Sequence, residues 1–274
     1  MARNWAGSPD SLNANGVLIP IANDTVGTVM FWVCLNSDTG TLDIISSMRR
    51  AADAKLTDMF ISANWSVSNN YLDFWCRLDN TMNWRYRTAV GSLTTYIGEW
   101  LHVAITQNAT APVCYFNGVS QSLTVITSVN TTKWFKAAIT DAASPSDTFY
   151  LGQSGASTNY MNSKLESFGI WDVVLSEDEI KAAARGVHHR RIRPLSGKVL
   201  MPLWGIHSPE IDLTPNAITG TLTGTTRAAT AAPVSSNWLS VSWSVPLIEV
   251  AVAAVAKRNF YHMYNRTAVY GGRS

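Results

Sequence analysis

The fold is decided by two short stretches, Trp-Leu-His-Val-Ala-Ile-Thr over residues 100–106 and Tyr-Phe-Asn-Gly over residues 115–118. In the first stretch, Leu101, Val103 and Ile105 alternate with polar, aromatic or small residues. Side chains on a β-strand point alternately to its two faces, so these three aliphatic side chains share one face. The first stretch therefore predicts a β-strand with one face in a hydrophobic core.

The second stretch ends in a tight turn. Asn117 and Gly118 both tolerate a positive φ, and this pair is typical of two-residue type I′ hairpin turns. On the preceding strand, Trp100 and His102 lie on the face opposite the aliphatic side chains. We interpret His102 as a packed, hydrogen-bonded strand residue; the alternative is a catalytic acid or base.

Similar β-rich segments fill the chain from residue 16 to about residue 151, separated by clusters of Gly, Asn, Asp, Ser and Thr. Regularly spaced strands without intervening helices are typical of antiparallel β proteins. We therefore predict an all-β fold, an antiparallel two-sheet β-sandwich of the jelly-roll type. The clearest segments are residues 28–35, 42–46, 58–65, 71–78 and 84–90.

One short helix is predicted near residues 176–185. Ser176 is a favoured N-cap, and Glu179 lies three residues later, as a capping box requires. We expect Trp171 and Leu175 to anchor this helix to the sandwich.

These segments, in this order, resemble laminin-G-like domains of the concanavalin A-like lectin/glucanase superfamily. The family pattern Trp-x-His-Val-Ala falls at residues 100–104, Tyr-x-Asn-Gly at 115–118 and Leu-Gly at 151–152. The closing pattern Ile-Trp-x-x-x-Leu-Ser-x-x-Glu-Ile falls at residues 170–180. The resemblance covers residues 10–186 and implies a concanavalin A-like jelly roll.

The rest of the chain is assigned by its composition. We expect residues 1–225 to form the sandwich, with residues 198–225 packing back onto it. Residues 226–237 are small and polar, and the remainder is apolar and aromatic. We interpret residues 226–274 as a C-terminal extension, made of a linker and a C-terminal arm for subunit or particle contacts.

Composition limits the classes of function. The 274 residues are 46% hydrophobic and 15% charged, and the net charge is +2. This excludes intrinsic disorder and gives no electrostatic reason to expect nucleic acid as a partner. No apolar run approaches the roughly 20 residues of a membrane span, and the N-terminus lacks the apolar segment of a secretory signal peptide. We expect neither a membrane partner nor secretion by a signal peptide.

The sequence offers no catalytic motif. Glycosidases of this superfamily need paired carboxylates on one strand, whereas Glu177 and Glu179 belong to the capped helix. Residues 152–155, Gly-Gln-Ser-Gly, do not form a nucleophile elbow. We expect no enzyme activity and no cofactor. Some relatives bind calcium through loop aspartates, but no residue of this chain can be matched to such a site.

A candidate glycan-binding face comes from aromatic residues that alternate with charged ones. Aromatic rings flanked by hydrogen-bonding groups are surfaces on which sugars stack. The same aromatics could instead form the inner face of the sandwich, and the sequence leaves both readings open. The residues are Tyr71, Trp75, Arg77, Trp84 and Tyr86.

A candidate assembly interface comes from the apolar C-terminal arm. Its side chains would be costly to leave in water and must pack on the domain or on another subunit. The residues are Trp238, Trp243, Leu247, Ile248, Phe260, Tyr261 and Tyr264.

Laminin-G-like sandwiches of this size occur in bacteriophage structural proteins. The resemblance therefore implies a non-catalytic virion protein, either a capsid decoration protein or a tail component, assembled in the host cytoplasm. Such a protein would be a homo-oligomer held by multivalent contacts to major capsid or tail proteins. The alternative is a carbohydrate-binding, lectin-like module that adheres to host or environmental glycans. A glycoside hydrolase is the more distant alternative.

Overall fold

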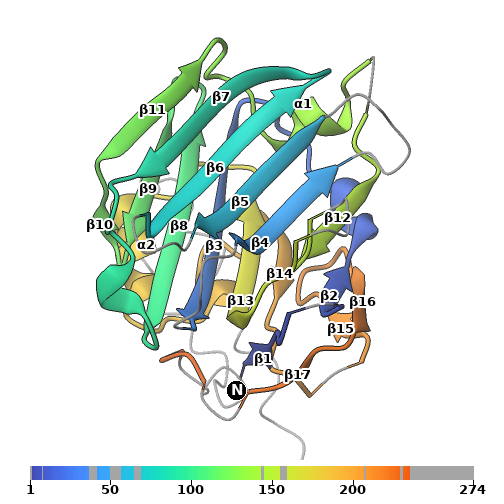
Figure 1. Ribbon diagram of the computed structural model, residues 1–274. Coiled ribbons are helices and arrows are strands. Elements are labelled where there is room, and N and C mark those ends of the chain that lie inside the picture. Colours follow the sequence, from blue (N-terminus) through green and yellow to red (C-terminus); the bar gives the residue numbers. More distant parts are fainter. Residues whose placement is uncertain are drawn as a thin grey trace, which may run out of the picture. The chain divides into compact units, whose positions relative to one another are not determined.

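The computed structural model describes residues 2–7, 9–36, 42–49, 57–64, 69–142, 145–154, 159–206, 208–228 and 231–234. They form two antiparallel β-sheets stacked face to face, as predicted (Figure 1). Residues 237–274 form a separate unit. That unit lies outside the described residues, and with it all seven residues of the candidate assembly interface: Trp238, Trp243, Leu247, Ile248, Phe260, Tyr261 and Tyr264.

The eight-stranded sheet contains both the first and the last described strands of the chain. β14 (Gly197–Met201) pairs with β13 beside the main path of the sheet. The strand order along that path is β10 (Val119–Ser120), β9 (Pro112–Phe116), β8 (Trp100–Asn108), β3 (Val26–Leu35), β13 (Ser163–Trp171), β1 (Arg3–Asn4) and β17 (Thr226–Arg227).

The nine-stranded sheet lies in front of the eight-stranded sheet in Figure 1. Its N-terminal strand β2 lies between a strand from the middle of the chain and a C-terminal hairpin. The order is β11 (Leu123–Ser128), β7 (Thr81–Thr88), β6 (Tyr71–Leu78), β5 (Asp58–Asn64), β4 (Leu42–Arg49), β12 (Thr148–Leu151), β2 (Ser11–Asn13), β16 (Thr219–Thr223) and β15 (Glu210–Ile211).

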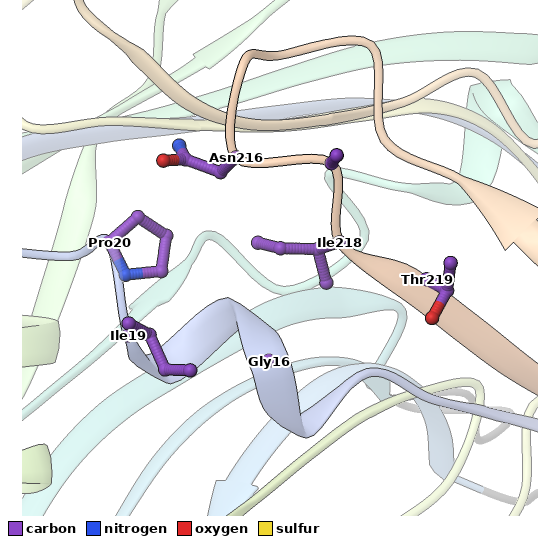
Figure 2. Close-up of a pocket in the computed structure, with 7 residues that line it drawn as sticks. Gly16, Ile19, Pro20, Asn216, Ile218 and Thr219 are labelled. Carbon is purple, nitrogen blue, oxygen red and sulfur yellow. The ribbon is translucent and has the colours of Figure 1, made fainter.

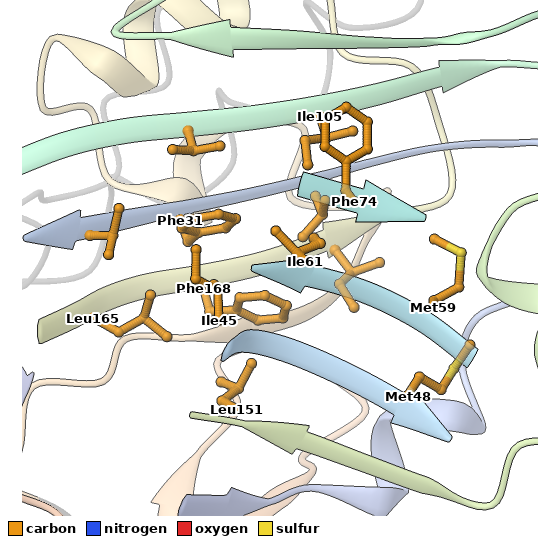
Figure 3. Packing of buried hydrophobic residues seen from close by; sticks show 14 of the residues in the cluster. Phe31, Ile45, Met48, Met59, Ile61, Phe74, Ile105, Leu151, Leu165 and Phe168 are labelled. Carbon is orange, nitrogen blue, oxygen red and sulfur yellow. The ribbon is translucent and has the colours of Figure 1, made fainter. Parts of the chain in front are cut away.

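The hydrophobic core fills the space between the sheets. Leu101, Val103 and Ile105 of β8 are buried in it, as the alternation of the strand predicts. Figure 3 shows Phe31 and Phe168 of the eight-stranded sheet and Phe74 of the other sheet within this core. The Phe168 ring packs against Phe149 of β12 in the other sheet, with ring centroids 5.9 Å apart. All three cysteines are free and buried: Cys34, Cys76 and Cys114.

The predicted helix is present as α2 (Glu177–Ala184). Its N-cap Ser176 accepts a hydrogen bond from the backbone N–H of Glu179, and the Glu179 carboxylate accepts one from the backbone N–H of Ser176. This completes the capping box. A second hydrophobic cluster, which includes Trp171, Leu175 and Ile180, joins α2 to the outer face of the eight-stranded sheet.

The structure contains more helix than the single helix predicted from the sequence. α1 (Phe135–Ile139) lies against β5 and β6, and it is too short to produce a recognisable helical period. Three 3₁₀ helices complete the described elements: η1 (Asn15–Leu18), η2 (Thr94–Tyr96) and η3 (His189–Arg191). No helix in the described ranges has the length and apolar composition that crossing a membrane requires.

The turn between β9 and β10 has the geometry that its sequence indicates. Asn117 and Gly118 have φ values of 49° and 80°. The Asn117 side chain also accepts a hydrogen bond from the backbone N–H of His102 at 2.9 Å. This bond ties the hairpin turn to the start of β8.

Residues after α2 return to both sheets. β14 extends the eight-stranded sheet, and the β15–β16 hairpin extends the nine-stranded sheet. β17 pairs with β1, so the chain is still part of the sheet at residues 226–227, where the sequence suggests the start of a linker.

Candidate functional site

The outer face of the nine-stranded sheet, which points away from the core, is the first surface to consider. On β6, Phe74 and Cys76 pack in the core, so Asp73, Trp75 and Arg77 point outward. Tyr71 shares this outer face but is itself buried. Three of the five residues predicted for a glycan-binding face therefore lie here: Tyr71, Trp75 and Arg77.

The Trp75 ring is covered on both of its faces. It stacks on Phe60 of β5, with ring centroids 4.6 Å apart and an interplanar angle of 6°. The guanidinium carbon of Arg85 on β7 lies 5.3 Å from the Trp75 ring. Trp75 also donates its indole N–H to Asp58 at 2.9 Å. A sugar needs an open ring face to stack on, and Trp75 offers none.

The charges around Trp75 are paired with one another. Arg77 forms an ion pair with Asp58, and Arg85 forms one with Asp73. The hydrogen bond to Asp73 raises the pKa of the Arg85 guanidinium. Both aspartates are almost fully buried beneath these contacts. In this part of the face, the aromatic and charged side chains therefore contact one another.

Trp84 and Tyr86 lie on the other side of the sheet, which corrects their assignment to the glycan-binding face. Both belong to the core between the sheets, and Trp84 donates its indole N–H to the carbonyl of Lys133 at 2.8 Å. On β7 the outward positions are occupied by Arg85 and Arg87 instead, because side chains alternate along a strand. The aromatic residues of β6 and β7 therefore do not form one surface.

A hollow of about 510 Å³ opens on the outer face at the other end of the nine-stranded sheet. Its volume falls within the range of roughly 300–1,000 Å³ that is typical of small-molecule sites. We call it the β12–β2–β16 hollow, after the strands that form it. Its lining residues are Pro9, Ser11, Asn13, Tyr150, Gln153, Tyr160, Thr221 and Thr223.

Strand register brings these residues together. Tyr150 of β12 is paired with Asn13 of β2, and Asn13 is paired with Thr221 of β16. The three side chains form one row on the outer face, because their neighbours along the strands, such as Leu12 and Leu151, are buried in the core. Ser11 and Thr223 form the next row.

The chain just after β12 supplies the other side of the hollow. Gly152 has a φ of +78°, and a Cβ atom there would lie 2.1 Å from the indole nitrogen of Trp5. Only glycine fits this turn. Beyond it, Gln153 forms an isolated β-bridge with Tyr160, and the Gln153 carbonyl accepts a hydrogen bond from the Ser47 hydroxyl at 2.7 Å.

The hollow combines aromatic rings with uncharged hydrogen-bonding groups. Within the described residues, neither Tyr150 nor Tyr160 stacks on another aromatic ring, and both are only half-buried. Three hydroxyl groups and two side-chain amides surround them. Such groups can stack on and hydrogen-bond a polyhydroxylated ligand.

Sequence reasoning missed this hollow. Residues 149–152, Phe-Tyr-Leu-Gly, were recognised only as a family pattern, although their alternation already places Tyr150 on the face opposite Phe149 and Leu151. No local signal in the sequence indicates that residues 11–13 and 221–223 lie beside Tyr150.

A second hollow of about 380 Å³ lies between η1 and the turn before β16. Figure 2 shows Ile19, Pro20 and Ile218 facing this space. The Asn216 side chain at its rim already donates to the carbonyl of Lys198 at 2.9 Å. The lining of this hollow is polar and apolar in equal measure, and no titratable side chain is among the described residues that form it.

A buried histidine pair lies on the covered side of the eight-stranded sheet. The Nε2 atoms of His102 and His189 are 3.4 Å apart, and both rings are fully enclosed. Burial lowers the pKa of His102 to about 3 and lowers that of His189 well below its usual value. His102 is therefore a packed strand residue, as its alternation indicates, and no substrate can reach it here.

No metal centre is evident in the part of the chain that the structure describes. Among those residues, no group of three or more His, Cys, Asp or Glu side chains is placed to hold a metal ion.

A family model described as the concanavalin A-like lectin/glucanases superfamily matches residues 7–181. The chain belongs to this superfamily. The resemblance inferred from the strand, turn and helix patterns is thereby confirmed. Among curated protein sequences, none matches the chain.

Solved structures of this superfamily's fold share the architecture. A candidate carbohydrate-binding protein from Bacteroides ovatus aligns with a TM-score of 0.58 and 17% identity, covering 85% of this chain and 61% of that one. The CBM40 module of a Ruminococcus gnavus IT-sialidase aligns with a TM-score of 0.50 and 12% identity, covering 67% of this chain and 96% of that module.

A third similar structure comes from a virus. Tailspike protein 2 of the Escherichia coli O157:H7 bacteriophage CAB120 aligns with a TM-score of 0.50 and 9% identity, covering 70% of this chain and 25% of that one. At these identities the three likenesses show the fold alone. The first two are carbohydrate-binding proteins or modules by description, not catalytic domains.

Proposed function

We propose that this protein is a carbohydrate-binding module and that its ligand occupies the β12–β2–β16 hollow. The observation that carries the proposal is the pair of tyrosines, Tyr150 and Tyr160, which stack on no aromatic ring of the described residues and lie over hydroxyl and amide groups. The descriptions of the Bacteroides and Ruminococcus structures, which share this fold, support the same class of ligand. Adhesion to host or environmental glycans is the role we propose for it.

The physical basis is complementarity to a sugar ring. A pyranose has apolar C–H faces and a polar rim of hydroxyl groups. A half-buried tyrosine ring covers the apolar face, while serine, threonine and amide side chains replace the water around the hydroxyls. The row formed by Tyr150, Asn13 and Thr221 offers both kinds of contact on one rigid sheet surface.

We further propose that the protein has no glycoside hydrolase activity. Hydrolysis needs one carboxyl group as general acid and a second as base or nucleophile. None of the described residues that line the hollow carries a carboxylate. On the same face, Asp58 and Asp73 are each held in an ion pair with an arginine, beneath the aromatic network. Neither is presented to a bound sugar.

Glycan-array binding of the full chain tests the proposal. We expect binding to at least one glycan, and we expect Tyr150→Ala to weaken it about 10-fold, the equivalent of about 1.4 kcal/mol. Tyr115→Ala is the matched control, because Tyr115 is a half-buried tyrosine on β9 of the other sheet. Near-ultraviolet circular dichroism of both variants verifies the fold. Absence of binding to all neutral and acidic glycans, or equal binding by Tyr150→Ala, would refute the proposal.

The virion role remains a second proposal, which is compatible with the first. The likeness to the bacteriophage tailspike supports it at the level of the fold. A capsid decoration protein or tail component would sit on the particle, contact capsid or tail proteins as a homo-oligomer, and expose its sugar-binding face. Deletion of residues 237–274 tests this: we expect loss of particle binding and of self-association. A truncated chain that still binds the particle in the same oligomeric state would contradict it.

A further inference from the structure

We infer that the β12–β2–β16 hollow selects an uncharged glycan and discriminates against sialylated or uronic-acid-containing ones. This inference rests on the proposed function and specifies its ligand class. It does not follow from the fold, because a similar structure is that of a CBM40 module bound to α2,3-sialyllactose, an acidic glycan. It follows from the charges and contacts around the hollow.

The lining carries no formal charge. All eight lining residues are proline, serine, threonine, asparagine, glutamine or tyrosine. In the sequence, the neighbouring residues outside the described ranges, Ser8 and the Gly-Ala-Ser-Thr run at 155–158, are also uncharged. A carboxylate brought into such a site loses hydration without gaining a cationic partner, which is unfavourable.

Among the described residues, three arginines elsewhere on the same face are occupied or distant. Arg77 and Arg85 are engaged by Asp58 and Asp73. Arg87 on β7 lies over the Tyr71 ring at 5.1 Å. β6, β5 and β4 separate β7 from β12, which puts four inter-strand spacings, about 19 Å, between Arg87's strand and Tyr150's.

Among the cations on the described strands of this sheet, Arg49 has the position nearest to the tyrosine row. It is paired with Thr148, whereas Ser47, two residues earlier on β4, is paired with Tyr150. Two residues along a strand correspond to about 7 Å. Arg49 is absent from the lining of the hollow. If an acidic sugar were the ligand, Arg49 would be the group to neutralise it, so Arg49 becomes a direct test.

The polar groups of the hollow suit hydroxyls. Ser11, Thr221 and Thr223 each supply a hydroxyl that both donates and accepts. The Asn13 carbonyl oxygen accepts a long hydrogen bond from the backbone N–H of Asn15 at 3.3 Å, and its amide NH₂ can still donate. Sugar hydroxyls also donate and accept, so the two sets match without any net charge.

The experiment compares matched pairs of glycans on one array, each neutral oligosaccharide beside its sialylated and its uronate counterpart. We expect the neutral member of a bound pair to bind at least about 10-fold more tightly. Its affinity should not change between low and high salt, since screening acts only on charged partners. Arg49→Gln and Arg87→Gln should leave binding unchanged. Thr221→Lys adds a cation to the hollow, so this variant should show a smaller difference in affinity between the neutral glycan and its acidic counterpart.

Two results would overturn the inference while leaving the proposed function intact. One is preferential binding of the acidic member of each pair. The other is loss of binding in Arg49→Gln or Arg87→Gln with the fold retained. Failure to bind any glycan of either class would instead refute the proposed function itself, so the two failures can be told apart.

Discussion

His102 of β8 and His189 of η3 meet nitrogen to nitrogen, with 3.4 Å between their Nε2 atoms in a fully buried contact. The His189 ring also packs edge-on against Trp171, and the His102 ring does so against Trp32. The pair fastens the segment after α2 onto the outer face of the eight-stranded sheet. Two imidazolium ions could not share this site, because burial and mutual repulsion both disfavour the charged form.

The histidine pair predicts loss of stability in acid. In the unfolded chain His102 titrates near its ordinary pKa of 6.5, whereas burial lowers the folded-state pKa to about 3. Between these values the unfolded chain binds a proton that the folded chain does not, so the free energy of unfolding falls as pH falls. At pH 5 the loss from His102 alone is about 2 kcal/mol. His189 acts in the same direction.

Urea denaturation at pH 7 and at pH 5 measures this effect. His102→Gln is the control, because glutamine does not titrate and the variant should lose less stability between the two pH values than the unmodified chain. Burial, Arg190 and Arg191 lower the pKa of His188 to about 4. His188 therefore contributes to the pH dependence of stability in both the unmodified chain and the His102→Gln variant. Equal losses in the two proteins would contradict the assignment.

Gly152 is predicted to be irreplaceable. Gly152→Ala strains a positive φ and drives a Cβ atom into the Trp5 indole, 2.1 Å away. Gly98 has nearly the same φ, +77°, but no atom within 4 Å of its would-be Cβ. We expect Gly98→Ala to lower the free energy of unfolding by about 1 kcal/mol, and Gly152→Ala by about 1–3 kcal/mol more. Thermal denaturation compares the stabilities of the two variants. Equal losses of stability would show that the Trp5 side chain moves away from the new Cβ atom at no cost.

Trp75 is predicted to stabilise the sheet without contacting the glycan. Trp75→Ala removes the stack on Phe60 and the hydrogen bond to Asp58, and should cost about 2 kcal/mol of stability. Trp75→Phe retains a ring between Phe60 and Arg85, and its glycan affinity should stay within about twofold of the unmodified chain. A large loss of glycan affinity in a folded Trp75→Phe protein would contradict this prediction and indicate that the glycan binds at Trp75, on the outer face of the nine-stranded sheet.

The capping box of α2 is predicted to contribute measurably to the free energy of unfolding. Ser176→Ala removes the oxygen that accepts from the Glu179 N–H and should cost about 1 kcal/mol. Ser176→Gly should cost only a few tenths of a kcal/mol, because glycine is tolerated at an N-cap. Chemical denaturation resolves this order. If both variants matched the unmodified chain, packing of Leu175 and Ile180 alone would hold the helix.

Much of the fold could be predicted because its signals are local. The alternation of Leu101, Val103 and Ile105, the Asn117–Gly118 turn and the Ser176–Glu179 capping box each depend on residues within a few positions of one another. The family patterns that indicated the superfamily, which the family model then confirmed, are of the same kind. α1 escaped prediction because five residues carry too little periodicity.

The candidate site could be predicted only in part, and the reason is register between distant strands. The sequence left open whether Tyr71, Trp75 and Arg77 form an outer face or part of the core. Only pairing with β5 and β7 placed Phe60 and Arg85 over the two faces of Trp75. Burial of Trp84 and Tyr86 likewise depended on which face of β7 met the core.

The sequence by itself determined an antiparallel sandwich, its capped helix, its hairpin turn and its superfamily, because each rests on short-range backbone preferences and strand alternation. Tertiary structure alone assembled the residues of the candidate site. It aligned Asn13, Tyr150 and Thr221, which are far apart in the chain, in one row across β2, β12 and β16. Within the part of the chain that the structure describes, no aromatic ring stacks on the tyrosines of this hollow, whereas neighbouring strands cover the indole of Trp75. Ring exposure depends on cross-strand neighbours that no local pattern specifies.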